Sequence, residues 1–537
     1  MSKGLKIVLP SAVSDPEGKL RKLEHYYGIE FVRGGSSDGY YRLIGDDELR
    51  DEMRFHNQIK LANVKDGSIQ YLYNQINLNL KADGTAASID GSDGGDVMQV
   101  HTKSVYAIIG GTNSAYERFI VSDAPFTYDG DQAVEFDPYG EAPDYMAVVD
   151  GKARSIFGAA GGTTAVGYGT NYSENVSYGD ATGFPRTSTT RYAYQNFSRA
   201  KNSATSSNLP YTIVSNFDIE LAFAFLAIEC RTKILTNVFG HGVSSNIAPT
   251  EATWNEGKVS GVRYRVAGDT GATWNYTTFG ATAFNVSGAT ASAASLNFWQ
   301  VINNYTPLTK VLEAQKGVSD GGELISVNDS DGNVIGAGTM TGVWKKNFSF
   351  NAKFSTASAT AASDWDVEVQ LAVPMWRGRN RMQGNLTQWY GGYEASCEYD
   401  DATSSTTYNV YRAPSIAALT TDSSDASFTY ESTYDLIATW TGITAAVGRY
   451  VTNMVCTNKG ITTAIGDFSK PSGRDKYTDE AAYTYVAVGA SGNKFRKGSP
   501  FGVTANFASA VFRVAGLNNA PSGANSNLGS AFRVALS

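Results

Sequence analysis

Paired acidic residues are the first side chains in this sequence that could do chemistry. Asp364 and Asp366 lie on either side of a tryptophan, and a second group follows at Glu398, Asp400 and Asp401. Two neighbouring carboxyl groups can cleave a glycosidic bond, one as the acid and the other as the nucleophile or base. On an alternating strand, however, Asp364 and Asp366 share one polar face, which requires no catalytic role. A glycan-degrading tailspike is more often a long β-helix with repeated coils, and the sequence has no such repeat.

Nucleophiles are the second kind of chemistry to consider. Gly317-Val-Ser-Asp-Gly321 has the spacing of a nucleophile elbow, but a chain with 55 glycines contains such a pattern by chance, and no histidine follows it. The three cysteines, Cys230, Cys397 and Cys456, are odd in number and far apart. This spacing argues against a disulfide framework and against a zinc cluster. The sequence therefore predicts that the protein is not an enzyme.

Metal binding would require clustered ligands. Asp90, Asp93 and Asp96 are regularly spaced in a segment rich in glycine and serine. Such a segment could hold calcium, because calcium takes several carboxylate oxygens from one loop. A solvated turn is the stronger interpretation of the same residues. His241 stands alone between two glycines and is interpreted as a turn residue. We expect no bound metal and no cofactor.

The composition indicates a β-rich globular protein with a polar, weakly charged surface. The 537 residues are 42% hydrophobic and 18% charged, and they include 55 glycines and 31 tyrosines. These residues suit many short strands and turns. The formal net charge of -8 and the lack of a basic block argue against a nucleic-acid partner.

The N-terminal residues indicate where the protein is made. Met1 to Pro10 lacks the long apolar core of a signal peptide, and no apolar run in the chain reaches bilayer length. We therefore expect synthesis in a host cytoplasm, without export by the usual route and without insertion into a membrane. A polar surface without an export signal fits a virion component released by lysis.

Residues 1–77 differ from the rest of the chain because charge is dense there. Pro16 suits the first turn of a helix, and the apolar residues between Leu20 and Tyr27 have helical spacing. Asp46 to Ala62 predicts a second helix, with acids first and bases later. Ile69 to Leu80 is predicted as a helix that turns into a strand. We interpret the region as a virion-attachment or oligomerisation arm; the alternative is a small subdomain packed on the rest.

The clearest helix of the sequence begins after Ser215. Ser215 can cap it, and Asp218 stands where the partner of a capping box would be. Four apolar residues share one face of this helix: Phe217, Leu221, Phe225 and Ile228. Their apolar neighbours widen that face so far that the helix must be nearly enclosed.

Strands are predicted in the second half of the chain. Trp365 to Leu371 alternates cleanly, and Phe348 to Phe354 is also typical of a strand. From Phe532 to Leu536, apolar residues alternate with Arg533 and an alanine, which is the period of a half-buried strand. Such a terminal strand is held in place only if it pairs inside a sheet. Asn518 to Asn527 is predicted as a long loop held by strands on both sides.

Three segments occur in an order known from one protein family. The first is Asp90-Gly91-Ser92 followed by Gly95-Asp96-Val97-Met98, and the last is the tail from Gly489 to Leu536. Between them, Pro374 to Gly392 matches the family at Arg377, Gly378, Asn380, Gly384, Asn385, Leu386, Trp389 and Gly392. These segments resemble the C-type-lectin-like domains of phage adhesins, which are related to formylglycine-generating enzymes and include variable proteins diversified by retroelements.

The resemblance implies an α+β, β-rich fold. It places a C-type-lectin-like domain at residues 78–537, with a β-rich insertion at about residues 250–372, after a partly helical attachment arm at residues 1–77. Two positions depart from the family pattern: Gln388 stands where the family has an acid, and residues are inserted between Gly529 and Phe532. Relatives that oxidise their substrates hold copper with two nearby cysteines, and the three cysteines here do not match that pair.

The resemblance also implies a function. It indicates a bacteriophage head or tail fibre, a homotrimer in the virion, that binds a host-surface glycan or protein through an exposed face between Gly489 and Phe532. Polar and aromatic side chains there supply contact area and adaptable hydrogen bonds. The candidate ligand-binding residues are Asn493, Lys494, Phe495, Arg496, Lys497, Phe501, Thr504, Asn506, Arg513, Asn518, Asn519, Asn525 and Asn527. Two alternatives stay open: a structural capsid-decorating or tail-scaffold protein that binds only virion proteins, and a glycan-degrading tailspike enzyme.

Overall fold

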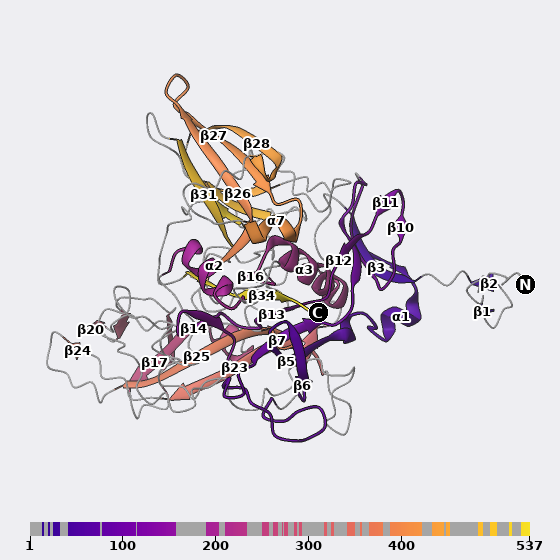
Figure 1. The fold of residues 1–537 in the computed structure, drawn as a ribbon. Helices are drawn as coiled ribbons and strands as arrows, with labels where there is room; N and C mark the ends of the chain where they lie inside the picture. The colour runs from indigo at the N-terminus through magenta and orange to yellow at the C-terminus, as the bar shows by residue number, and fades with distance from the viewer. Residues whose placement is uncertain are drawn as a thin grey trace, which may run out of the picture.

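The structure of the protein, a computed structural model, consists mainly of antiparallel sheets with few helices among the residues it describes (Figure 1). This confirms a β-rich α+β fold. The described residues are 13–14, 20–21, 25–32, 41–75, 78–113, 115–156, 189–202, 210–232, 250–256, 261–266, 271, 273–277, 284–286, 289–292, 316–318, 324–326, 341–349, 355–356, 365–379, 387–421, 432–444, 447–451, 482–486, 494–501, 515–517 and 528–536.

One antiparallel sheet is built from residues near the N-terminus. Its five strands are β3 (Tyr26–Val32), β4 (Tyr41–Gly45), β8 (Val105–Gly110), β9 (Tyr116–Ser122) and β12 (Val134–Phe136). Their order is β12-β8-β9-β3-β4. Apolar residues of β3, β8 and β9 are buried, so that this sheet forms one wall of the main core.

A second antiparallel sheet contains the end of the chain. Its strands are β5 (Ile59–Lys65), β6 (Ser68–Leu72), β7 (Asp96–His101), β13 (Tyr139–Glu141), β16 (Tyr211–Ile213) and β34 (Phe532–Ala535), in the order β16-β34-β13-β7-β5-β6. Strand β34 therefore lies inside the sheet, which confirms the predicted pairing of the terminal strand. Its expected half-burial is wrong, because Phe532, Arg533 and Val534 are all buried.

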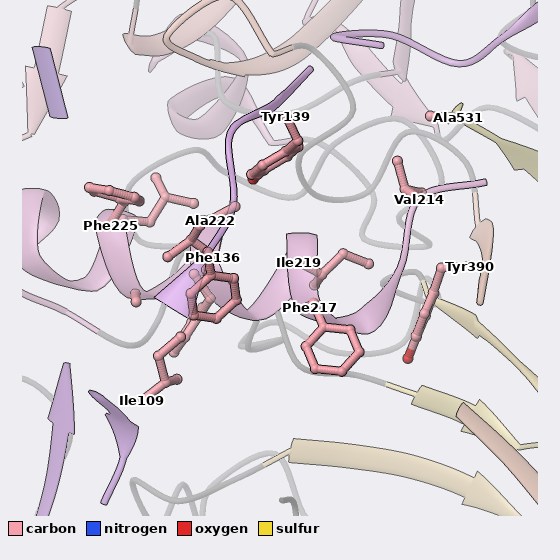
Figure 2. Close-up of a cluster of buried hydrophobic side chains, with 14 of the residues drawn as sticks. Ile109, Phe136, Tyr139, Val214, Phe217, Ile219, Ala222, Phe225, Tyr390 and Ala531 are labelled. Carbon is pink, nitrogen blue, oxygen red and sulfur yellow. The ribbon is translucent and has the colours of Figure 1, made fainter. Parts of the chain in front are cut away.

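The helix predicted after Ser215 is confirmed as α3 (Asn216–Cys230), with the predicted capping box between Ser215 and Asp218. Every residue of α3 except Glu229 is buried. The helix lies between the two sheets: Phe223 meets Phe119 of β9 edge to face at 5.3 Å, and Phe225 lies 5.8 Å from His101 of β7. Figure 2 shows apolar side chains of α3 with residues of both sheets around them.

A third sheet projects from this core (Figure 1). Its strands are β26 (Thr387–Asp400), β27 (Ser405–Arg412), β28 (Asp435–Ile443), β29 (Val447–Val451), β30 (Ala482–Val486), β31 (Lys494–Phe501), β32 (Ala515–Leu517) and β33 (Leu528–Ser530). The order is β28-β27-β26-β31-β32-β30-β29, and β33 pairs with β26 in parallel. A short helix, α7 (Ile416–Thr421), packs near the base of β26.

The remaining strands form smaller sheets. The four strands β17 (Gly261–Val266), β18 (Asn275–Thr277), β23 (Thr341–Ser349) and β25 (Trp365–Trp376) form one sheet in the order β18-β17-β25-β23. Strand β25 confirms the predicted strand at Trp365 to Leu371, and β23 covers the start of the one predicted at Phe348. The shorter strands are β1 (Val13–Ser14), β2 (Leu20–Arg21), β10 (Thr127–Tyr128), β11 (Asp131–Gln132), β14 (Ala147–Val149), β15 (Lys152–Arg154), β19 (Phe284–Val286), β20 (Ala289–Ser292), β21 (Lys316–Val318), β22 (Leu324–Ser326) and β24 (Ser355–Thr356).

The helix predicted from Asp46 to Ala62 is mostly wrong. Asp46 does cap a helix, because its carboxylate accepts a hydrogen bond from the Leu49 N–H at 3.0 Å, but α1 ends after one turn (Asp47–Asp51). A 3₁₀ turn follows at His56–Gln58, and β5 begins at Ile59. Pairing of β5 with β7, which comes later in the sequence, overrides the local helical preference.

Two further expectations near the N-terminus also differ from the structure. The helical spacing between Leu20 and Tyr27 is not realised as a helix, since β2 and the start of β3 occupy its described residues. Ile69 to Leu72 is a strand from its first residue rather than a helix. The other helices among the described residues are α2 (Arg191–Arg199) and α5 (Glu251–Glu256).

The expected boundary between residues 77 and 78 runs through two sheets. Strand β3 pairs with β9, and β5 pairs with β7, so that residues before and after the boundary share one core. By contrast, β1 and β2 pair with each other and lie apart from the body, next to the N-terminus, in Figure 1.

Candidate binding surface

Five of the thirteen candidate ligand-binding residues lie on the described backbone, all in β31: Lys494, Phe495, Arg496, Lys497 and Phe501. The other eight lie outside the described residues: Asn493, Thr504, Asn506, Arg513, Asn518, Asn519, Asn525 and Asn527. The predicted loop from Asn518 to Asn527 also lies outside them. The structure therefore bears on one strand of the predicted face and on the strands beside it.

The register of β31 against β26 sorts its residues into two rows. Arg496 lies opposite Ser396, and Lys494 lies opposite Glu398. Phe495 and Lys497 lie opposite Cys397 and Ala395, which are buried. Because directly opposite residues of an antiparallel pair belong to the same face, only the first row belongs to the exposed face of β26. Phe501 lies further down, opposite the buried Gln388.

One face of the projecting sheet is a packed core. Tyr408 and Val410 of β27 are fully buried, and the ring of Tyr408 stacks on Trp440 of β28 at 6.1 Å between centroids. Ala395 and Cys397 of β26 are buried on the same face. These contacts fix the backbone of β26, β27 and β28 without help from the opposite face.

The opposite face of these three strands is polar and partly exposed, and we call it the display face. Its residues are Ser396, Glu398, Thr407, Asn409, Tyr411, Leu436 and Thr439. They form cross-strand rows, in which Asn409 lies between Ser396 and Thr439. The Thr439 hydroxyl donates a hydrogen bond to Asn409 Oδ1 at 2.9 Å. Leu436 is 56% exposed and lies opposite Tyr411.

Two structural features bound the display face. At its base, Glu394 of β26 is buried in an ion pair with Arg191 of α2. At its tip, Asp400 closes the β26–β27 turn by accepting hydrogen bonds from the Thr403 hydroxyl at 2.8 Å and the Ala402 N–H at 2.9 Å. The hydrogen bond from Thr403 lowers the pKa of Asp400 most, and the one from the Ala402 N–H lowers it further. Asp400 is therefore charged in neutral solution.

The end of the chain is attached to the core by a buried ion pair. Arg533 Nε lies 3.0 Å from Asp218 Oδ1, and its guanidinium covers the Tyr139 ring at 4.9 Å. Asp218 also accepts hydrogen bonds from the Ser215 N–H and hydroxyl. The capping carboxylate of α3 thus neutralises the arginine of the last strand, which explains why β34 is covered on both faces.

A second buried network holds the segment that resembles the family's central motif. Arg377 donates to the His56 carbonyl oxygen at 2.8 Å and to Glu229 at 3.1 Å, while the Trp376 indole N–H donates to Glu229 at 2.8 Å. Burial alone would raise the pKa of Glu229, but the charge of Arg377 and these hydrogen bonds lower it. Trp389 of the same motif is fully buried. Asn380 to Leu386 lies outside the described residues.

Two histidines that no sequence pattern singled out are buried beside α3. His56 shares a hydrogen bond with the Tyr27 hydroxyl at 2.7 Å and another with the Phe225 carbonyl oxygen at 2.8 Å. His101 stacks on Tyr139 at 4.5 Å. Burial lowers the pKa of both imidazoles to about 3, so that both are neutral in the folded protein. His241 lies outside the described residues.

The acids considered as metal ligands have other partners. Asp96 pairs with Arg154 at 2.9 Å and with Lys201 at 2.6 Å. Asp90 and Asp93 accept hydrogen bonds from backbone N–H groups two residues later, as in solvated turns. Within the described ranges, no three His, Cys, Asp or Glu side chains gather where they could hold a metal.

The other residues considered for chemistry lie on different helices and strands. Cys230 ends α3 and Cys397 lies in β26; both are buried, and neither forms a disulfide. Asp366 lies opposite Arg265 in the register of β25 with β17, as expected of a polar strand face. Gly317 and Val318 belong to β21, whereas Ser319 to Gly321, Asp364 and Cys456 lie outside the described residues.

No family model matches this chain, and comparison with curated proteins finds no match. Among the helices of the described ranges, none combines the length and apolar character needed to cross a bilayer.

Most of the display face was missed by sequence reasoning. The signal that could have found it is the alternation in Ser405 to Arg412, where Thr406, Tyr408 and Val410 are buried and the residues between them are partly exposed. That period matches the neighbouring strand β26, and the two together define a face that neither strand defines alone.

Proposed function

We propose that this protein is a bacteriophage fibre, of head or tail, that binds a receptor on the host surface through the display face. The observation that carries the proposal is the contrast between the two sides of β26, β27 and β28. One side is a packed core, and the other presents hydroxyl, amide, carboxylate, aromatic and aliphatic groups to solvent. Such a mixture is typical of surfaces that recognise other molecules.

The way the chain closes supports the same proposal. Strand β31 lies beside the display face, whereas β34, later in the chain, is held in the core by the ion pair of Arg533 with Asp218. Side chains on the display face can therefore change with little effect on the core. This is the property that the resemblance to variable lectin-like proteins implies, and on the same grounds we propose that the fold is C-type-lectin-like.

Attachment to the virion is proposed for the N-terminal end. Residues 26–72 contribute strands to the core, so the part available for attachment is the segment that holds β1 and β2. We propose that this segment joins other virion proteins and that three copies assemble. Three display faces on one fibre would multiply a weak contact by avidity.

Adsorption to the host bacterium tests the proposed function. The double variant Asn409→Ala, Thr439→Ala removes one amide and one hydroxyl from the display face. The matched control, Gln70→Ala with Ser68→Ala, removes the same groups from exposed positions of β6. We expect labelled protein carrying the first pair to bind cells about tenfold more weakly, and the control to bind normally.

The same experiment separates the two alternatives. If adsorption is normal but particles fail to assemble with the display-face variant, the protein is a virion scaffold. If the pure protein releases oligosaccharide from the host's capsular glycan, it is an enzyme. Normal adsorption and normal assembly by the display-face variant would refute the assignment of the binding surface.

A further inference from the structure

Strand β34 fills a position between two strands that do not pair with each other. It pairs with β13 on one side and with β16 on the other, and both pairings are antiparallel. Within the described part of the chain, β16 pairs with no other strand. We call the position between β13 (Tyr139–Glu141) and β16 (Tyr211–Ile213) the strand site.

Backbone hydrogen bonds extend the pairing with β16 at both ends. The Val214 N–H donates to the Ala531 carbonyl oxygen at 3.0 Å, and the Ala535 N–H donates to the Pro210 carbonyl oxygen at 3.1 Å. These bonds involve main-chain atoms alone, so they hold an extended strand without selecting its sequence. Selection depends on the side chains, which alternate between the two faces of the strand.

Apolar side chains fit one face of the strand site. Phe532 and Val534 are both fully buried, and the Phe532 ring lies 6.2 Å from the Tyr211 ring between centroids. Gly140 lies opposite Val534 in the register. A Cβ atom added to Gly140 would lie 3.4 Å from Val534 Cγ1, so the glycine makes room for a branched side chain.

The other face of the strand site selects an arginine. Arg533 Nε lies 3.0 Å from Asp218 Oδ1, and the guanidinium covers the Tyr139 ring at 4.9 Å. A guanidinium suits this combination because it pairs with a carboxylate and stacks on an aromatic face. A further contact precedes the strand, where the Ser530 hydroxyl donates to the Trp389 carbonyl oxygen at 2.8 Å. The two contacts, on α3 and on β26, fix the spacing between the serine and the arginine.

The sequence contains a second copy of the pattern that occupies the strand site. Residues 530–536 are Ser-Ala-Phe-Arg-Val-Ala-Leu, and residues 509–517 are Ser-Ala-Val-Phe-Arg-Val-Ala-Gly-Leu. The copy at 509–517 therefore has one residue inserted before Phe-Arg-Val-Ala and one after it. With its arginine placed at Asp218, its serine would be one residue too far away to bond β26. A peptide of residues 509–517 is thus a matched control for the spacing.

We propose that the strand site is a peptide-binding site whose ligand is an extended segment with the pattern Ser-Ala-Phe-Arg-Val-Ala. The protein fills the site with its own residues 530–535. Main-chain bonds supply affinity, and Asp218, Tyr139 and Gly140 select arginine followed by a branched apolar residue. The same contacts bind this segment when it is a separate peptide. The proposal does not depend on receptor binding by the display face.

The test keeps every residue of the chain present. A protease site is inserted between Ala520 and Pro521, and the folded protein is cleaved there. We expect the fragment that begins at Pro521 to remain bound through gel filtration. Incubated with labelled peptides in excess, the cleaved protein should take up residues 528–537 about tenfold more tightly than residues 509–517. Native mass spectrometry measures the uptake.

Substituted peptides test the side-chain contacts. Arg533→Met in the peptide of residues 528–537 should weaken uptake about a hundredfold, and Ser530→Ala about threefold to tenfold. Ala535→Ser is the control, because Ala535 is exposed, and it should bind normally. Equal uptake of all the peptides would overturn the proposed selection. Loss of the fragment on cleavage, whether or not the remaining protein stays folded, would overturn the peptide-binding site itself.

The intact chain gives a readout that needs no cleavage. Amide hydrogen exchange in β34 should be as slow as in β7, since both strands lie inside the same sheet. Arg533→Met in the full chain should speed exchange in β34 about tenfold or more, whereas Ala535→Ser should leave it unchanged. Exchange in wild-type β34 at the rate of an unprotected strand would contradict the proposal.

Discussion

The C-terminal residues contribute strands to two sheets that differ in whether polar side chains are buried or exposed. In the six-stranded sheet, Arg533 of β34 is buried and neutralised by Asp218 of α3. In the projecting sheet, Thr439 and Glu398 of the display face are exposed to solvent. Both β34 and β26 carry charged residues next to apolar ones. The difference lies in what packs against the strand.

This comparison shows that alternation alone does not reveal a surface. An alternating strand has two distinct faces, but the sequence of that strand does not say whether its polar face meets water or a neutralising partner. For β34 the partner is the capping residue of a helix that lies more than three hundred residues earlier. Substitutions that act on one sheet and spare the other would establish the distinction.

The largest difference is expected between two apolar side chains. Phe223 of α3 is fully buried against Phe119, whereas Leu436 of the display face is exposed. Phe223→Ala should lower the free energy of unfolding by about 3–5 kcal/mol, because it leaves a cavity. Leu436→Ala should change it by no more than about 0.5 kcal/mol. Urea denaturation followed by tryptophan fluorescence measures both. Equal losses would show that the display face is part of the core.

The buried ion pair gives the next largest effect. Arg533→Met leaves Asp218 buried without its partner, and we expect a loss of about 3 kcal/mol in the free energy of unfolding. Arg54→Met serves as the control, because Arg54 is exposed. A double variant that adds Asp218→Asn should recover part of the loss, since the uncompensated charge is then gone. If Arg533→Met unfolds at the same urea concentration as the wild type, the terminal strand is not anchored by this pair.

The elements that were predicted correctly are determined by residues close to one another in the sequence. The capping box of Ser215 and Asp218 and the apolar run after it define α3 within a few residues, and Phe532 to Ala535 alternates as a strand must. The predicted helix from Asp46 failed at Ile59, because β5 pairs with β7 and the sequence of β5 does not carry that information. Most of the display face was missed for the same reason, because its residues are brought together by the pairing of β26, β27 and β28.

The buried histidines make the core, but not the display face, sensitive to pH. The pKa of His56 and of His101 is about 3 in the folded protein and about 6.5 when unfolded. The unfolded chain therefore binds more protons in this range, and stability that is complete above pH 6.5 is lost as the pH falls toward 3. Between pH 7.5 and pH 6 we expect a loss of about 1–2 kcal/mol in the free energy of unfolding.

Charged groups surround each imidazole ring and contribute to its pKa. Arg377 and Glu229 face His56, while Asp218, Arg379 and Arg533 face His101. His56→Gln should reduce the pH dependence by about half, and His25→Gln, at an exposed position, should leave it unchanged. Denaturation curves at several pH values report the slope. A wild-type stability that is flat from pH 7.5 to pH 6 would contradict the burial of these rings.

The smallest expected effect compares one kind of hydrogen bond in the two sheets. Thr212 of β16 is buried and bonds the amide of Gln195 through its hydroxyl, at 2.9 and 3.1 Å, whereas the Thr439 hydroxyl bonds the Asn409 amide in an exposed position. Thr212→Val should cost about 1–2 kcal/mol in the free energy of unfolding, because the buried amide of Gln195 loses one of its hydrogen-bond partners. Thr439→Val should cost about 0.5 kcal/mol or less, because water replaces the lost hydroxyl. If the exposed substitution costs as much as the buried one, the display face contributes to stability and is not free to vary.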